Sequence, residues 1–62
     1  MSTRRYRLIL KDKGKEFSRE INLNNDGPVV YFLNWVEGEY GFETTIKEIW
    51  WLRDDGVEEQ IR

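Results

Sequence analysis

The chain contains no cysteine and no histidine, although it has only 62 residues. A chain of this length buries roughly 60% of the surface that its unfolded form exposes, and its core supplies about 3–5 kcal/mol of net stability. Small domains often add disulfides or a structural zinc ion, and this chain lacks the cysteines for disulfides and for thiolate zinc sites. We therefore expect one domain, residues 1–62, held together by large apolar side chains, which three Trp, three Tyr and three Phe supply.

The same two absences limit the chemistry of the chain. No thiol is present to act as a nucleophile, and no imidazole is present to act as a general base. Asp54-Asp55 and Glu58-Glu59 are adjacent acids. Adjacent acids in a turn are usually solvated, and neighbours on a strand point to opposite faces. We expect a protein that is not an enzyme and that uses no cofactor or metal ion.

Charge is unevenly distributed along the chain. Residues 1–20 hold seven basic and three acidic side chains, whereas residues 21–62 hold three basic and nine acidic ones. Neighbouring strands of opposite charge explain this distribution, and a basic face for phosphates is the alternative. No apolar run approaches the ~20 residues that span a bilayer, and the N-terminal residues lack the apolar segment of a signal peptide. We expect a cytoplasmic protein that does not enter a membrane.

Residues 4–23 are expected to form a hairpin. Apolar and basic side chains alternate in RRYRLILK, which is the period of a half-buried strand. The sequence KDKG supplies the turn, in which Gly14 can take a positive φ. Phe17, Ile21 and Leu23 then form the apolar face of the return strand. Arg19 interrupts that face, so the register there remains open.

Residues 24–42 predict a helix with a start signal and a stop signal. Asp26 or Gly27 can cap it, and Pro28 belongs in a first turn, where its missing N–H costs nothing. Gly41 can supply the left-handed residue that ends a helix, with Phe42 folding back. The sequence VVYF favours a strand locally, which is the alternative.

The predicted helix has one apolar stripe and one mixed side. The stripe that we expect to face the sheet consists of Val29, Phe32, Leu33, Val36 and Tyr40. Tyr31 and Trp35, with Asn34, lie on the other side. We expect these two aromatic side chains to face solvent.

Residues 45–53 fit either a helix or a strand. Thr45 followed three residues later by Glu48 is a capping-box pattern. A helix would place Arg53 within its apolar stripe, whereas Thr, Ile and Trp all favour a strand. Asp55-Gly56 then makes a two-residue type I′ turn into VEEQIR, in a register that pairs Trp50 with Ile61. We favour the strand.

The element order is therefore strand, strand, helix, strand, strand. One helix on one face of a four-stranded sheet buries these apolar faces, so the expected class is a single small α+β domain. If the helix connects the two hairpins as a crossover, the arrangement is β-grasp-like, with strand order 2-1-4-3 and the first and last strands parallel at the centre. The stretch RYRLIL resembles the first strand of the immunoglobulin-binding domains of streptococcal protein G, which have this architecture and a similar length. The resemblance implies topology only and assigns no binding residues.

Side chains alternate along a strand, so the adjacent tryptophans must point to opposite faces. We expect the helix to be faced by Ile46, Trp50, Leu52, Val57 and Ile61. We expect the open side of the sheet to carry Lys47, Ile49, Trp51 and Arg53. Trp51 is thus the predicted exposed aromatic residue.

Two surfaces are candidate binding sites. The first is the open sheet face, with Trp51 at its centre and Ile9, Ile49, Arg5, Arg7, Lys47 and Arg53 around it. The second is the solvent side of the helix, with Tyr31 and Trp35. Exposed aromatic residues covered by Arg and Lys stems are also common on surfaces that bind nothing, which is the alternative reading.

The residue types on these surfaces indicate a binding protein. Trp, Tyr and Arg together are typical of protein-binding hot spots. We expect a non-catalytic module that docks on a larger protein, as regulators, inhibitors and accessory factors do, including small ones of phages and mobile elements. Single-stranded nucleic acid stacked on the open face is the alternative, although Glu20, Glu58 and a pI of about 5.0 disfavour it. A homodimer through the same surfaces is a further alternative.

Overall fold

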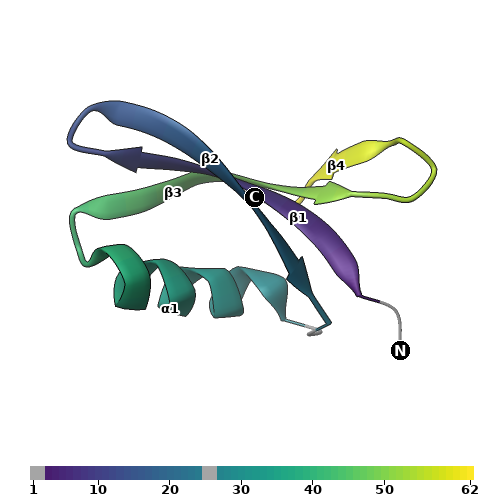
Figure 1. The fold of residues 1–62 in the computed structure, drawn as a ribbon, viewed down its shortest axis with the longest axis horizontal. Coiled ribbons are helices and arrows are strands. Elements are labelled where there is room, and N and C mark those ends of the chain that lie inside the picture. Colours follow the sequence, from purple (N-terminus) through teal and green to yellow (C-terminus); the bar gives the residue numbers. More distant parts are fainter. Residues whose placement is uncertain (1–2, 25–26) are drawn as a thin grey trace.

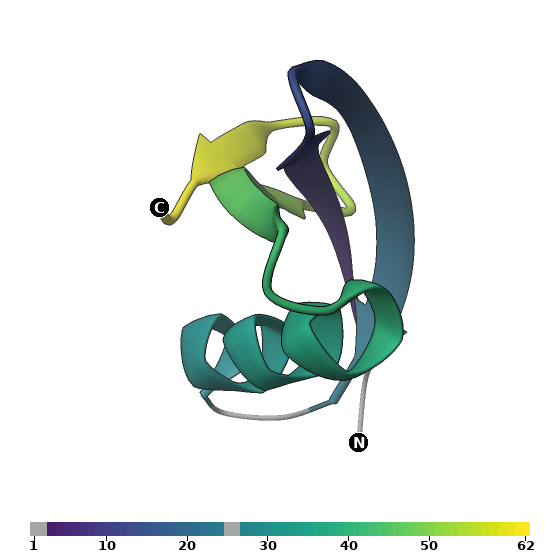
Figure 2. The same ribbon diagram turned by 90° about the vertical axis from the view of Figure 1, so that its left-hand side faces the viewer.

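The computed structural model describes residues 3–24 and 27–62. It contains β1 (Arg4–Asp12), β2 (Lys15–Leu23), α1 (Pro28–Tyr40), β3 (Thr44–Leu52) and β4 (Glu58–Gln60). The strands form one twisted sheet, and α1 packs against one of its faces (Figure 1, Figure 2). The predicted α+β class and the ββαββ order are confirmed, and residues 45–52 belong to a strand rather than a helix, with Arg53 outside it. Within the described residues, no helix is long and apolar enough to cross a membrane.

The strand order is β2-β1-β3-β4, and all three neighbouring pairs are antiparallel. The predicted β-grasp order, with the last strand parallel to the first, is therefore wrong. Strand length explains the difference. β3 has nine residues and β4 has three, so only β3 can pair along the length of β1.

The first hairpin has the predicted turn and the predicted apolar face. Asp12 pairs with Lys15 across a two-residue turn, in which Lys13 and Gly14 both have positive φ. On the return strand, Phe17 and Ile21 pack against the core cluster and Leu23 belongs to it.

Arg19 keeps its place in that apolar face without interrupting the register. It pairs with the buried Leu8, and its guanidinium extends over the core edge toward α1. Its Nη1 donates to the Tyr40 hydroxyl at 2.7 Å, and its Cζ lies 5.8 Å from the centroid of the Trp35 ring. The side chain therefore covers the aromatic residues of α1 while its charged end stays at the surface.

The helix begins and ends where the sequence indicates. Gly27 is the N-cap, Pro28 occupies the first turn, and Gly41 caps the C-terminus with a φ of 88°. Asp26, the other predicted cap, lies outside the described residues. Phe42 does not fold back: its side chain is 87% exposed.

The helix is rotated relative to the predicted stripe. Phe32 and Val36 are buried as predicted, and Trp35 is partly buried against the core instead of facing solvent. Leu33, predicted to face the sheet, is 40% exposed. On this side of the helix, the Trp35 ring lies under the Arg19 guanidinium of β2, and the Tyr40 ring meets Phe17 of β2 edge to face, so this side faces β2.

A β-bulge decides which side chains of β3 face the helix. Ile9 pairs with Glu48, and the next residue of β1, Leu10, pairs with Ile46, so Lys47 is the extra residue. Side chains alternate on both sides of the bulge, but the extra residue inverts the alternation. In β3, even-numbered residues face the helix before the bulge, and odd-numbered residues face it after the bulge.

This inversion reverses the predicted orientation of the two adjacent tryptophans. Trp51 pairs with the buried Tyr6 and packs against the core. Trp50 pairs with Arg7 on the open face of the sheet. The tryptophans do lie on opposite faces, but the prediction that Trp50 faces the helix and Trp51 the open side is wrong.

The turn of the second hairpin has three residues instead of the predicted two. The Gly56 N–H donates to the Arg53 carbonyl at 3.2 Å, and the Arg53 N–H donates to the Val57 carbonyl at 3.0 Å. Gly56 has a φ of 88°, as a turn followed by a glycine bulge requires. Asp55 stabilises this longer loop, because its Oδ1 accepts the Val57 N–H at 3.1 Å.

The longer turn shifts the pairing of β3 with β4 by one residue. Trp50 pairs with Gln60 rather than with Ile61. Ile61 still packs against the core, as predicted, whereas Val57 is 51% exposed. Leu52 is buried, but on the open face, where it pairs with Arg5.

Candidate functional site

The predicted sheet-face site is not assembled as expected. Ile49 is fully buried in the core, and Trp51 lies on the helix side of the sheet. Arg5, Arg7 and Ile9 remain on the open face, because they alternate with buried residues of β1. The proposed centre of the site and two of its predicted neighbours, Ile49 and Arg53, are therefore separated from the rest by the sheet itself.

Several side chains of the open face already pair with one another. Arg7 Nη1 lies 2.8 Å from Glu58 Oε1. Lys47 Nζ lies 3.2 Å from Glu16 Oε1, so the Lys47 side chain spans β1 to reach β2. The Trp50 Nε1 donates to Glu48 Oε1 at 2.7 Å. Two of the predicted cationic residues on this face thus already have anionic partners.

Trp51 lies among guanidinium groups on the other face. Arg4 Cζ is 4.7 Å and Arg53 Cζ is 5.3 Å from the centroid of the Trp51 ring. Arg53 also forms an ion pair with Asp55, with 3.2 Å between Nη2 and Oδ2. Arg4 was not among the predicted residues. The indole is therefore a partly buried ring covered by cations rather than a free stacking surface.

The two aromatic residues predicted to share the solvent side of the helix also lie apart. Tyr31 is 40% exposed, whereas Trp35 is partly buried beneath Arg19 and beside Tyr40. The rotation of α1 that brings Trp35 toward β2 moves it away from the solvent side. Tyr31 and Trp35 do not form one exposed surface.

A different region, along the outer edge of β3, is left unpaired because β4 is short. β4 pairs only with Trp50–Leu52, and Ile49 makes the last contacts with the C-terminal residues. The Ile61 N–H donates to the Ile49 carbonyl at 2.9 Å, and the Ile49 N–H donates to the Arg62 carbonyl at 3.1 Å. Along residues 44–48, no strand in the described part of the chain pairs with this side of β3.

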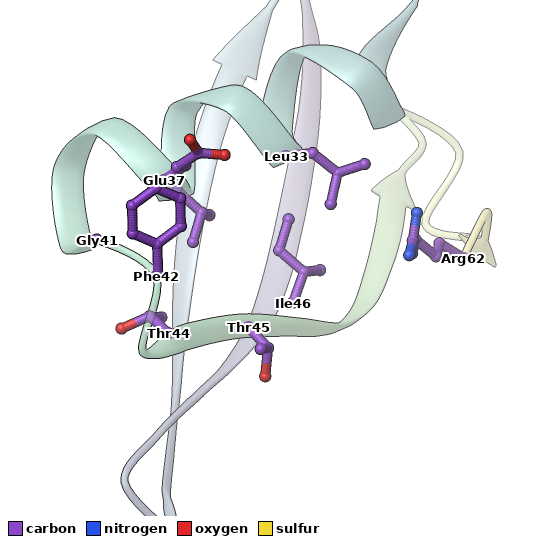
Figure 3. Close-up of a pocket in the computed structure, with 9 residues that line it drawn as sticks. Leu33, Glu37, Gly41, Phe42, Thr44, Thr45, Ile46 and Arg62 are labelled. Carbon is purple, nitrogen blue, oxygen red and sulfur yellow. The ribbon is translucent and has the colours of Figure 1, made fainter.

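A groove follows this unpaired edge, between β3 and α1. It encloses about 440 Å³ and is lined by Leu33, Val36, Glu37, Gly41, Phe42, Thr44, Thr45, Ile46 and Arg62 (Figure 3). Leu33, Phe42 and Ile46 supply its apolar surface. Leu33 and Phe42, which the sequence predicts to pack against the sheet and the helix, are both exposed. Val30, one turn before Leu33 on the helix, is also exposed and lengthens the apolar surface.

Sequence reasoning missed this groove, because its parts are ordinary elements of the sequence. The position of Phe42, directly after the glycine that ends α1, predicts that its side chain folds back onto the helix. It does not indicate that the side chain lies beside β3. Among residues 3–24 and 27–62, no group of three or more acidic, His or Cys side chains is placed to hold a metal ion. What the groove offers is a hydrogen-bonding edge beside apolar side chains.

No family model, no curated protein and no solved structure matches this chain.

Proposed function

We propose that the protein is a non-catalytic protein-binding module that takes up an extended segment of a larger protein in the groove between α1 and β3. The observation that carries this proposal is the unpaired outer edge of β3 along residues 44–48, which lies directly beside apolar side chains. Extended peptides add to exposed sheet edges through main-chain hydrogen bonds, and pockets beside the edge select alternate side chains. A regulator, inhibitor or accessory factor could use such a groove to hold its target.

Phe42 is the side chain best placed to anchor a partner. Its ring is 87% exposed beside the groove, and an exposed aromatic ring gains most when a partner covers it. Leu33 and Ile46 extend the same apolar surface across the groove (Figure 3). Together they provide a small centre that excludes water, next to backbone groups that can hydrogen-bond.

The edge strand on the opposite side of the sheet is less suited to strand addition. β2 carries Lys15, Glu16, Arg19 and Glu20, all exposed. Charged side chains on an edge strand oppose pairing with another chain. On β3, β4 and the C-terminal residues already pair with residues 49–52, so the free edge is short, which limits uncontrolled association while leaving room for a short segment.

Single-stranded nucleic acid is the weaker candidate. Base stacking requires accessible aromatic faces, and two guanidinium groups already lie over the Trp51 ring. Glu16 and Glu58 pair with cations of the open face and would repel phosphates there. A phosphate-bound ligand would also lose orders of magnitude in affinity between about 50 and 200 mM salt, which distinguishes it from a strand held in the groove.

Selection from a displayed peptide library, with the whole protein immobilised, tests the proposal. We expect enriched peptides to bind the parent protein and to lose at least about 2 kcal/mol of binding free energy, roughly 30-fold in affinity, with Phe42→Ser. Val57→Ser is the matched control, because it removes another exposed apolar side chain that does not line the groove. Amide exchange at residues 44–48 should slow when peptide binds. Peptides that bind both variants equally and leave those amides unprotected would contradict the proposal.

A further inference from the structure

We infer that the segment bound in the groove runs antiparallel to β3, in line with β4, and carries Lys or Arg two residues after a large apolar side chain. This inference rests on the proposed function. The apolar side chain occupies the space between Leu33 and Ile46, and the cation lies against Phe42 and Glu37.

The direction of the segment follows from the position of β4. β4 is antiparallel to β3 and its pairing ends at Trp50, with residues 61–62 bonded to Ile49. A segment that continues the same edge in the same direction meets β3 from Glu48 toward Thr44. Antiparallel pairs are also slightly more stable per residue than parallel ones.

The two-residue spacing between the apolar side chain and the cation follows from the alternation of side chains along paired strands. Thr44 and Ile46 point to the helix side of the sheet, so partner residues opposite them also point into the groove. A side chain opposite Ile46 meets Leu33 across the groove. Two residues later, opposite Thr44, a side chain reaches the end of the groove that Phe42 and Glu37 line (Figure 3).

The positive charge of the second side chain of the bound segment follows from the electrostatics of the end of the groove that it reaches. The last turn of α1 contains Glu37 and Glu39 and no basic residue, although a helix C-terminus carries a partial negative charge. Neither carboxylate forms an ion pair with a residue that the structure describes. The neighbouring Glu43 is already paired with Lys13, at 3.2 Å between Oε2 and Nζ. This end of the groove therefore has uncompensated negative charge beside an exposed aromatic ring, which is the environment that attracts a cation.

Three blocked peptides test the inference by chemical-shift titration of the isotope-labelled protein. They are Thr-Val-Thr-Leu-Thr-Arg-Thr and the same peptide with Gln or Glu in place of Arg. Titration to about 5 mM peptide detects affinities in the millimolar range. At low salt we expect the Arg peptide to bind about tenfold more tightly than the Glu peptide, with the Gln peptide between them. An exposed ion pair contributes about threefold, and a like-charge contact costs a similar factor.

Charge reversal in the protein provides the matched comparison. Glu37→Arg should reverse the order of the Arg and Glu peptides, whereas Glu20→Arg, the same change on β2, should preserve it. Glu37 and Glu20 are both exposed, and the dispersion of the amide spectrum checks that each variant is folded. The preference should shrink as salt is raised.

The outcomes separate this inference from the proposed function. If all three peptides shift the amides of residues 44–48 with equal affinity, strand addition stands and the charge preference is overturned. If no peptide shifts those amides, both the inference and the proposed groove are overturned. A preference for Arg that survives Glu37→Arg would place the cation elsewhere and overturn the inference alone.

Discussion

The ring of Tyr6 on β1 meets the ring of Phe32 on α1 edge to face, with the centroids 5.3 Å apart. Both side chains are buried, so this contact joins the sheet to the helix inside the core. Edge-to-face aromatic pairs contribute about 0.5–1.5 kcal/mol beyond the area that they bury. In a chain of this size, such a contact is a large fraction of the net stability.

Phe32→Ala should leave the protein largely unfolded at room temperature. Removing a buried Phe costs about 3–5 kcal/mol, which matches the stability expected for a domain of this size. Thermal unfolding followed by circular dichroism measures the effect. Val30→Ala is the control on the same helix, because Val30 is 65% exposed and its loss should change the stability by less than about 0.5 kcal/mol. A cooperative Phe32→Ala transition near that of the parent would contradict the core assignment.

The same substitution at two glycines of the helix region should have opposite effects. Gly41 has φ 88° and ψ −169°, a conformation almost restricted to glycine, so Gly41→Ala should destabilise the protein by about 1–3 kcal/mol. Gly38 lies within α1 with open space around the position of an added Cβ. Gly38→Ala should therefore stabilise it by up to about 1 kcal/mol. Urea unfolding of both variants provides the comparison, and effects of the same sign would show that one of the two backbone assignments is wrong.

Arg19 and Tyr40 should be energetically coupled. Arg19 Nη1 donates to the Tyr40 hydroxyl at 2.7 Å, and hydrogen bonds of this kind contribute about 0.5–1.5 kcal/mol. A double-mutant cycle with Arg19→Ala and Tyr40→Phe isolates the contact, since Tyr40→Phe removes the hydroxyl and keeps the ring that packs on Phe17. We expect a coupling free energy of about 1 kcal/mol. Additive effects of the two substitutions would mean that the hydrogen bond contributes nothing to stability.

Trp51→Ala should destabilise the protein more than Trp50→Ala. Trp51 packs against the core and has two guanidinium groups over its ring, whereas Trp50 lies on the open face and donates one hydrogen bond to Glu48. Losing partly buried packing together with the cation–π contacts should cost about 2–3 kcal/mol. For Trp50→Ala we expect a loss smaller by at least about 1 kcal/mol. Denaturant midpoints of the two variants decide this, and the reverse order would contradict the inversion of faces at the bulge.

Local signals in the sequence predicted the elements, and for the first hairpin and the helix also their ends. The alternation in RRYRLILK, Pro28 in the first turn of the helix and Gly41 at its end all act over a few neighbouring residues. Their physical causes are equally local: backbone sterics, a missing N–H group and the freedom of glycine at positive φ. For this reason the ββαββ order, the first hairpin and the strand character of residues 45–52 could be predicted before any tertiary contact was known.

The faces of those elements depend on contacts between distant residues. Nothing local to TTIKEIWWL indicates a bulge, because the bulge exists only where Ile9 and Leu10 of β1 meet Glu48 and Ile46 across the sheet. Because of that single extra residue, Lys47, the side chains of Ile49 and Trp51 face the core. They therefore cannot belong to the predicted site on the open face. The rotation of α1 likewise involves residues distant in sequence, since Trp35 and Tyr40 contact Arg19 and Phe17 of β2.

The candidate site was likewise decided by tertiary structure alone. The sequence by itself determined that a small domain without cysteine or histidine would rely on aromatic residues and that some of these would be exposed. Only the tertiary structure decided that Phe42 is one of them and that it lies beside an unpaired edge of β3. The physical reason is that a free edge is a property of strand pairing. It depends on β4 being too short to cover β3, and on a three-residue turn that sets where their pairing begins.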